Sequence, residues 1–390
     1  MIERKSALKK LIVLLSLVVL FVTLTLLSKS KAVCEFFAST FARAWIFVFG
    51  NIFGVLPFSG YELFLIAAIV LAVVFCVYLV IFLAKRRWNR LVSMLLIAAI
   101  TVFSFLNIYT ATASMTYNRK DLPADIYSQY SSKDLTYAEA LEIANIIIDR
   151  ANETFSATKH DIDGNIVYPF NYKELCDMMK EEYKRLDNRY FSSYTPSGKR
   201  IINKTIMSEL HITGVFFAPF GEANVNGNEN NLYLPHTLAH EIAHSKGVMK
   251  EFQADIVSCY VLLQSDNPYL SYGAYVQCLN SALNIVSLYP DSKADCNLLE
   301  AKVNDAIYTE RRNYTAFYSQ FHHFDDLGDF LNDIYLKLQK QPDGSGSYVK
   351  PGEIIDTGNT DNDGRPIVEV VNFSGMQNLL ITLYKQGKLA

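Results

Sequence analysis

The chain changes at about residue 112 from long apolar stretches to a mixed pattern of apolar and polar residues. Before this point three apolar segments, at about 11–28, 62–84 and 91–110, have the length of membrane-spanning helices. The alternative, buried core helices of a large soluble protein, does not suit apolar stretches of this length without an internal charge. The pattern therefore predicts a multi-pass α-helical membrane anchor over residues 1–112.

Two parts of this anchor allow more than one interpretation. The segment at 11–28 could be a signal peptide, but its apolar run is long for one and no small-x-small cleavage site follows closely, which favours a retained anchor. The stretch 29–60 is aromatic and moderately apolar, but Glu35 and Arg43 interrupt it. We therefore expect an interfacial loop and helix there, not a full span.

The pattern from 113 to 390 is that of a globular domain. Apolar residues recur at helical spacing in several segments, and two β-rich stretches occur at 213–225 and 354–370. A Gly/Ser turn is expected at 341–347. The pattern predicts a mainly α (α+β) domain with a small sheet and helices at 135–155, 172–186, 256–263, 269–288, 294–317 and 326–338.

The stretch 213–225 has Pro219 and Gly221 inside it. Proline and glycine confine a strand to a sheet edge or a bulge, so this stretch is expected to be an edge strand. An extended peptide can add to such an edge by backbone pairing. The candidate residues for this contact with a substrate are Phe216, Phe217, Ala218, Glu222 and Asn224.

The stretch 354–370 predicts two strands around a polar loop. Asn359, Asp361, Asp363 and Gly364 partly match a calcium-binding loop, but Val370 stands where the bidentate glutamate belongs. This departure favours a solvated hairpin turn over a calcium site.

Charge is distributed as unevenly as hydropathy. Residues 1–110 hold eleven Lys and Arg against three acidic residues, a net charge of +8, which leaves −11 for the remainder because the whole chain carries −3. Basic residues concentrate before the first span and at 85–90, and the positive-inside rule places both on the cytoplasmic side. Three spans then deliver residues 113–390 to the outside of a cell membrane, with the lipid bilayer as a partner. The acidic domain does not suit nucleic acid.

The cysteines show no metal-binding spacing. None of the six belongs to a C-x-x-C pair, so the simplest interpretation is that they are small apolar core residues. A disulfide among Cys176, Cys259, Cys278 and Cys296 stays open, because the domain is expected to face an oxidising compartment.

The candidate chemistry lies at 240–244, which reads His-Glu-x-x-His. On a helix His240 and His244 lie on one face a turn apart, where two ring nitrogens can reach one zinc ion. Glu241 projects beside them, where it could act as a general base on a zinc-activated water. The motif therefore predicts a zinc hydrolase, with a peptidase as the first candidate.

The third ligand requires a break in this helix. Glu251 follows His244 by seven residues, which in an unbroken helix would place its α-carbon about 10 Å further along the axis. Gly247 readily adopts the left-handed conformation that ends a helix. We therefore expect the first helix to stop at Gly247.

A second helix from about Met249 could return Glu251 to the metal. Asp255 would follow one turn later and could orient a ligand histidine from behind. The alternative is that Glu251 and Asp255 form an ordinary solvated face beside Lys250. The motif upstream favours Glu251 as ligand and Asp255 as its supporting acceptor.

Other residues offer weaker candidates. His236 lies about 12 Å of helix rise from His244, which argues against a shared ion and favours a pocket or packing role. His322, His323 and Tyr348 could donate to an oxyanion from a distant segment, although their spacing does not select them.

Three segments together resemble a known family: 214–226, 234–247 and 251–255. They are similar to a bacterial family of polytopic membrane proteins known only as a domain of unknown function and regarded as zinc metallopeptidases of gluzincin type. The likeness extends over most of the chain, including the anchor and the segments at 334–337 and 347–348. It implies a zincin-like domain in which His240, His244 and Glu251 bind zinc and Glu241 is the base.

One position departs from the family pattern. Where Glu-Ala-Asn usually follows, this chain has Gln253-Ala254-Asp255, and Asp255 instead matches the E-x-x-x-D pattern of better-known gluzincins. This departure does not weaken the assignment of the metal ligands. Because the family has no established substrate, the resemblance supports the fold and the site more than a biological role.

Together these features predict a membrane-anchored metallopeptidase that uses one zinc ion to hydrolyse a peptide or protein substrate. The alternative function is a non-catalytic zinc-binding membrane sensor or assembly protein with a zincin-like domain, whose structural site would be closed by a fourth ligand such as His236, Glu222 or Asp255. A transporter is disfavoured, because the apolar cores of the three spans contain no charge.

Overall fold

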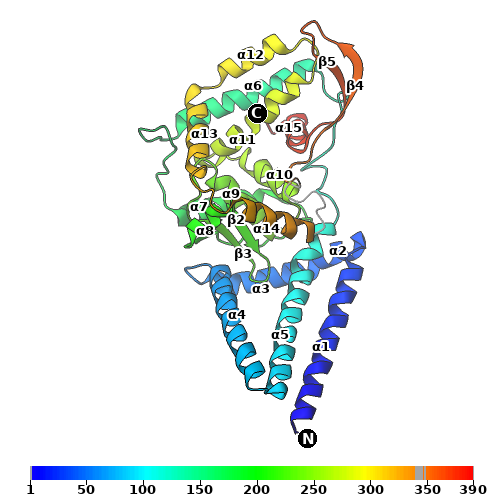
Figure 1. Ribbon diagram of the computed structural model, residues 1–390. Helices are drawn as coiled ribbons and strands as arrows, with labels where there is room; N and C mark the ends of the chain where they lie inside the picture. The colour runs from blue at the N-terminus through cyan, green and yellow to red at the C-terminus, as the bar shows by residue number, and fades with distance from the viewer. Residues whose placement is uncertain (1, 339–345, 347, 390) are drawn as a thin grey trace.

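The structure, a computed structural model, describes residues 2–338, 346 and 348–389. The predicted Gly/Ser turn at 341–347 lies almost entirely outside these residues. Over these residues the chain is mostly helical, with two small sheets (Figure 1).

The anchor contains the three predicted apolar helices. They are α1 (Ile2–Leu27), α4 (Gly60–Ala84) and α5 (Trp88–Tyr109), which extend together from one end of the domain (Figure 1). The Ser59 hydroxyl caps α4 by accepting from the Glu62 N–H at 3.1 Å. Asn107 of α5 donates to the Leu17 carbonyl of α1 at 3.0 Å, a polar contact between two helices.

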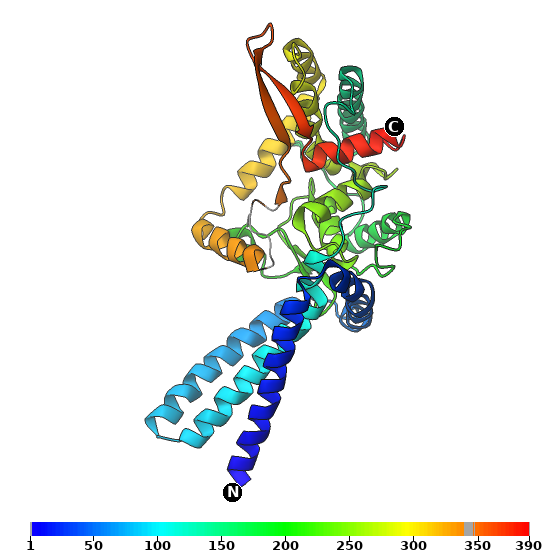
Figure 2. The same cartoon turned by 90° about the vertical axis from the view of Figure 1, so that its right-hand side faces the viewer.

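A fourth helical stretch of the anchor lies within 29–60, where the sequence predicts an interfacial loop and helix. In the part of the chain that the structure describes, four helical stretches are long and apolar enough to cross a membrane, and Lys31–Gly54 is one of them. It consists of α2 (Lys31–Phe37), η1 (Ala38–Ala42) and α3 (Arg43–Gly54). This stretch lies across the domain-side ends of the other three (Figures 1 and 2). The helix η2 (Thr110–Ser114) then leads from α5 into the domain.

The domain is built mainly from helices around one large core. Helix α6 begins at a capping box, in which Thr136 and Glu139 bond each other's backbone N–H groups, and it packs along α11 through its buried isoleucines. The domain helices are α6 (Tyr137–Ala157), α7 (Tyr172–Glu182), α8 (Lys204–Glu209), α9 (Leu234–Ser245), α10 (Glu251–Leu262), α11 (Pro268–Ser287), α12 (Lys293–Lys302), α13 (Asp305–Tyr318), α14 (Asp325–Leu338) and α15 (Gly375–Lys385), with short turns η3 (Thr116–Asn118) and η4 (Tyr183–Arg185).

The single helix predicted at 294–317 is wrong, because the structure has two helices there. Val303 is extended, with φ −68° and ψ 130°, and ends α12. The Asn304 side chain then starts α13 by accepting from the Ala306 N–H at 3.0 Å. Helix α15 lies outside all the predicted helices, although Ser374 and Gln377 form a capping box at its start.

The β-rich stretch at 213–225 is a hairpin and not one edge strand. Its strands are β2 (Gly214–Phe217) and β3 (Glu222–Asn226), and the sheet order is β1-β3-β2 with β1 (Lys199–Ile201) parallel to β3. Pro219 and Gly221 lie in the turn, where Gly221 has a φ of +65°. Only β2 is therefore an edge strand beside the candidate site, and the prediction is wrong for Glu222 and Asn224, which lie on the central strand.

The predicted hairpin at 354–370 is confirmed. It consists of β4 (Glu353–Thr360) paired antiparallel with β5 (Pro366–Asn372). Asp361 accepts from the Arg365 N–H at 2.8 Å and closes the turn between them. The oxygens of Asp291, Asp361 and Asp363 lie within 4.8 Å of one another, and the Arg365 guanidinium pairs with two of these carboxylates.

The cysteines behave as the composition indicates. All six lie among the described residues and all are free. Four of them, Cys34, Cys176, Cys259 and Cys278, are buried. The expectation that they are small core residues is confirmed for these four.

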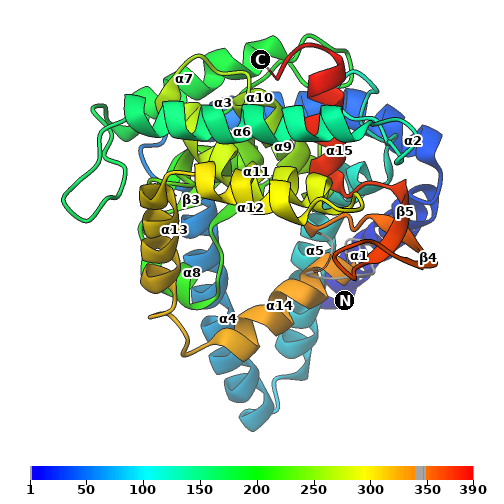
Figure 3. The same ribbon diagram turned by 90° about the horizontal axis from the view of Figure 1, so that it is seen from above.

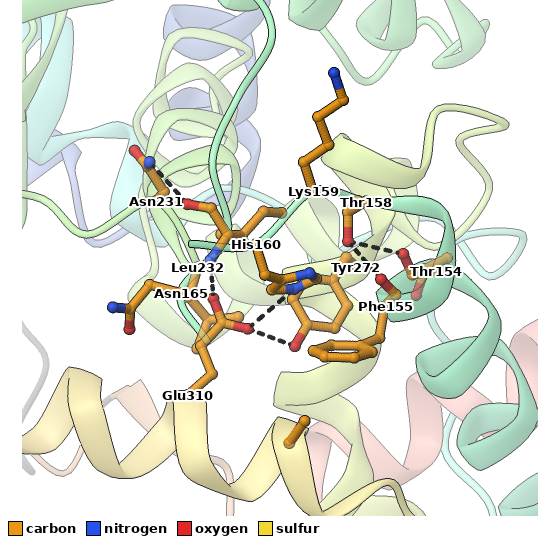
Figure 4. A network of polar contacts seen from close by, with 12 residues as sticks. Thr154, Phe155, Thr158, Lys159, His160, Asn165, Asn231, Leu232, Tyr272 and Glu310 are labelled. Carbon is orange, nitrogen blue, oxygen red and sulfur yellow. Dashed lines mark hydrogen bonds and ion pairs between the residues drawn. The ribbon is translucent and has the colours of Figure 1, made fainter. Parts of the chain in front are cut away.

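A buried polar network fixes the segment after α6 against α11 and α13 (Figure 4). Glu310 of α13 accepts from the Tyr272 hydroxyl at 2.6 Å and from the Ile166 N–H at 2.7 Å. His160 lies 3.7 Å from the same carboxylate and packs on the Phe155 ring at 4.1 Å. Burial raises the pKa of Glu310, against the opposing effect of these two hydrogen bonds.

We expect Glu310→Leu to lower the free energy of unfolding by about 2–4 kcal/mol, because it leaves two buried donors without an acceptor. The measurement is thermal unfolding of the full chain in detergent. Glu181→Gln is the matched control, since Glu181 pairs with Lys184 in an exposed position and its loss costs less than about 1 kcal/mol. Equal stabilities of the two variants would contradict a structural role for the network.

Candidate metal centre

Helix α9 carries the His-Glu-x-x-His motif through the interior of the domain. Pro235 stands in its first turn, where a missing N–H costs nothing, and every residue of the helix is buried. The His240 and His244 rings lie on one face with centroids 4.7 Å apart and planes at 84°. The helix therefore presents two imidazoles to one point, as the spacing predicts.

Gly247 ends this helix as expected. It has a φ of +90°, its N–H donates to the His244 carbonyl at 2.9 Å, and the Val248 N–H donates to the Ala243 carbonyl at 3.2 Å. Helix α10 then begins at Glu251, two residues after the expected start. The turn reverses the chain within a few residues and brings the start of α10 back to the histidines.

Glu251 returns to both histidines. Its Oε2 lies 3.1 Å from Nε2 of His240 and 3.5 Å from Nε2 of His244. The three residues are buried, and their ligand atoms lie within 4.8 Å of one another. They could therefore hold one divalent ion, and two imidazoles with a carboxylate are donors that suit zinc.

Two further contacts orient the imidazoles. Nδ1 of His240 lies 2.8 Å from Oδ1 of Asp255, and Nδ1 of His244 lies 2.7 Å from the Val248 carbonyl oxygen. With Nδ1 engaged in this way, each ring offers Nε2 towards Glu251. Asp255 therefore occupies the supporting position that the sequence predicts for it.

The electrostatics of the two central carboxylates differ. Burial alone would raise the pKa of Glu251, but the adjacent His244 and His240 lower it to about 2. Burial raises the pKa of Glu241 to about 7, against the attraction of the same two histidines. Glu251 is thus the ionised partner of the imidazoles, while Glu241 is a separate carboxyl.

Glu241 lies outside the group of three and has space on one side only. Its Oε2 is buried and has no hydrogen-bond partner among the described residues. Gly214 of β2 closes the other side, because a Cβ at this position would collide with Oε1 of Glu241. The carboxyl is therefore held beside the candidate ligands with an oxygen available for a further donor.

A cavity of about 580 Å³ adjoins these residues. Of the predicted substrate and oxyanion residues, Phe216, Phe217 and Tyr348 line it, and so does His236. The Tyr348 ring lies 6.4 Å from the His240 ring at an interplanar angle of 28°. His236 instead bonds Ser258 at 2.9 Å, which agrees with a pocket or packing role.

The other candidate residues have different positions. Among the described residues that line the cavity, Ala218, Glu222, Asn224, His322 and His323 do not occur. His323 is tied to Glu209 at 2.9 Å, and His322 lies 3.2 Å from the Gln320 carbonyl. Neither histidine is placed to bind an oxyanion at this site.

Glu222 and Asn224 instead fasten the domain to the anchor. Glu222 pairs with the buried Lys199 at 2.5 Å and accepts from the Tyr61 N–H at 2.9 Å, at the first turn of α4. Asn224 accepts from the Ser59 hydroxyl at 2.7 Å. These two residues are therefore buried because they connect the domain to the anchor. Their contacts do not support the predicted role in binding substrate.

Arg119 is an important residue that the sequence did not single out. It is 2 % exposed, its Nη1 donates to the Gly247 carbonyl at 3.1 Å, and its Nε and Nη2 bond the Glu35 carboxylate at 3.1 and 2.8 Å. Its guanidinium also stacks on the Tyr190 ring at 3.6 Å. One buried cation thus joins α2 of the anchor to the turn between the two metal-site helices.

Comparison with known proteins places this chain in a family. A family model described as "Protein of unknown function (DUF3810)" matches residues 37–352, most of the chain. No curated protein and no solved structure matches the chain. The matched range includes the motif helix, the returning helix, two of the four apolar anchor stretches in full and most of a third, Lys31–Gly54. The chain therefore belongs to the DUF3810 family of proteins of unknown function.

Proposed function

We propose that this chain is a membrane-anchored, zinc-dependent metallopeptidase. The observation that carries the proposal is the convergence of His240, His244 and Glu251 beside Glu241, a buried carboxyl with an oxygen that has no partner among the described residues. Two histidines, a carboxylate and an adjacent free base form the set that metal-assisted hydrolysis of a peptide bond requires.

Different residues of the chain would hold the metal ion and transfer the proton. His240, His244 and Glu251 would hold the ion, and Asp255 fixes the orientation of His240. Zinc, when bound, lowers the pKa of water and polarises a carbonyl. Glu241 would take the proton from the attacking water and later give it to the leaving amine.

The surroundings favour this function over a non-catalytic zinc site. A structural site would be closed by a fourth protein ligand, and three residues were candidates for that closure. Glu222 binds the anchor, Asp255 binds Nδ1 of His240, and His236 bonds Ser258. Each of the three has another partner, so none of these candidates closes the site as a fourth ligand, which supports the catalytic alternative.

Metal analysis of the full chain in detergent tests the cofactor. We expect one zinc ion per chain, and we expect Glu251→Gln to weaken zinc binding by more than about 100-fold, because loss of an outer partner alone costs about 10–100-fold. His236→Gln, on the same helix one turn before His240, is the matched control and should retain zinc. A wild-type chain without zinc, or equal zinc in both variants, would refute the ligand assignment.

A further inference from the structure

The membrane anchor forms part of the cavity wall. Tyr61 is the second residue of α4, Tyr109 is the last residue of α5, and Tyr117 lies in η3 just beyond them, and all three line the cavity together with His240 and Glu241. The ends of two membrane-spanning candidates therefore lie against the same space as the candidate metal centre.

The edge strand of the site packs directly on these two anchor helices. The Phe217 ring of β2 lies 5.0 Å from Tyr61, 5.2 Å from Phe64 and 6.3 Å from Phe105. On the same short strand, Gly214 adjoins Glu241. Because a four-residue strand connects the spans to the candidate base, the site lies close to the membrane surface.

Helix α14 forms another wall and exposes an apolar face. Leu327, Phe330, Leu331 and Ile334 have the i, i+3, i+4, i+7 spacing of one helical face and are 39–59 % exposed. Leu331 also lines the cavity, next to Gly328, Asp329 and Asn332 of the same helix. Exposed apolar faces of this kind are typical of helices that lie in a membrane interface.

The position of α14 agrees with a place at the interface. Helices α4 and α5 lean towards the side of the molecule on which α14 lies, and α14 runs across their direction (Figures 1 and 2). Its start is fixed to the domain, because Asp325 pairs with His211 at 2.8 Å. Seen from above, α14 overlies the region of α4 and α5 (Figure 3).

From these contacts we infer that the substrate of this site is a polypeptide anchored in the same bilayer and cleaved a few residues from the membrane surface. The inference rests on the proposed peptidase function and names its substrate class. A chain that leaves the cavity past Tyr61, Tyr109 and α14 passes the ends of the spans at once. An extended chain advances about 3.3 Å per residue, so a short spacer suffices to reach the lipid.

The test uses the full chain in lipid vesicles and a pool of quenched fluorescent decapeptides of mixed sequence. The pool is supplied free, or joined to a single transmembrane helix through a flexible spacer of about 5 or about 40 residues. We expect the short-spacer form to be cleaved about 100-fold faster than the free form and faster than the long-spacer form, since tethering raises the effective concentration and shorter tethers raise it further.

The relative cleavage rates of the short-spacer and long-spacer forms distinguish this inference from a simple concentration of substrate at the membrane. A site held away from the bilayer would cleave the long-spacer form faster. That order, or equal rates for the free and short-spacer forms, would overturn the inference and leave the peptidase function intact. If the zinc-loaded chain cleaves none of the three forms, the proposed function fails and the inference fails with it.

A variant of α14 tests the route itself. Phe330→Asp places a charge on the apolar face and should lower the ratio of short-spacer to free cleavage by ~10-fold or more, because it removes the burial of one large side chain in the interface. Leu298→Asp is the matched control, since Leu298 is 66 % exposed on α12, away from the anchor, and should leave this ratio unchanged (Figure 1). An unchanged ratio in Phe330→Asp would exclude α14 from the route.

Discussion

Glu241→Gln should lower the rate of peptide hydrolysis by roughly 10²–10⁴-fold, the usual contribution of a general base, while the zinc content stays at one ion per chain. Glutamine preserves the size of the side chain but cannot accept the proton. Because Glu241 is separate from His240, His244 and Glu251, its neutral replacement leaves the candidate ligands in place. The measurements are the initial rate on a quenched peptide pool and the zinc content of the same sample.

Gly214→Ala changes the position of the base without changing its chemistry. The new Cβ would collide with Oε1 of Glu241, so the carboxyl must move and the rate should fall while zinc is retained. Gly54→Ala is the matched control, because its Cβ would meet no atom within 4 Å. Full activity of Glu241→Gln would refute its role as base, and loss of zinc from that variant would mean that Glu241 supports the metal centre instead.

Arg119→Met should destabilise the folded chain by about 1–3 kcal/mol, the usual cost of leaving buried hydrogen-bonding groups without a partner. The substitution removes the donors to the Glu35 carboxylate and to the Gly247 carbonyl. Since Gly247 forms the turn that returns Glu251 to the histidines, zinc affinity should fall as well. Thermal unfolding in detergent and zinc titration measure the two effects.

Two further variants control for this effect. The double variant Arg119→Met with Glu35→Leu should recover part of the lost stability, because the carboxylate is no longer left without its cation. Arg150→Met removes an exposed pair with Glu153 and should cost less than about 1 kcal/mol. If Arg119→Met is as stable as Arg150→Met, Arg119 does not hold the anchor to the metal-site turn.

Local spacing explains why much of the candidate site could be predicted. The apolar anchor helices follow from uninterrupted runs, and the motif helix follows from the interval between His240 and His244. The return of Glu251 follows from helix geometry together with the conformational freedom of Gly247. Asp255, which contacts Nδ1 of His240, is also close to it in the sequence. All of these features depend on residues that lie close to one another along the chain.

Strand pairing and the break in the helix at 294–317 show where sequence patterns are insufficient. A β-rich stretch with an internal proline and glycine fits either an irregular edge strand or a hairpin turn, and only the pairing of β3 with β1 and β2 decides between them. Because β3 is the central strand, Glu222 and Asn224 contact the anchor and are not on an edge where a substrate could pair. Helical periodicity likewise continues across Val303 and Asn304, two extended residues that separate two helices.

By itself, the sequence determined the apolar anchor helices, the mainly helical character of the domain and the residues that could hold a metal, since these depend on local composition and spacing. The tertiary structure alone decided which anchor residues meet that site. Arg119 contacts Glu35 across 84 residues and Gly247 across 128, and Glu222 contacts Gly60 across 162. No local pattern records such contacts, because they arise from burial and hydrogen bonding between segments that only the folded chain brings together.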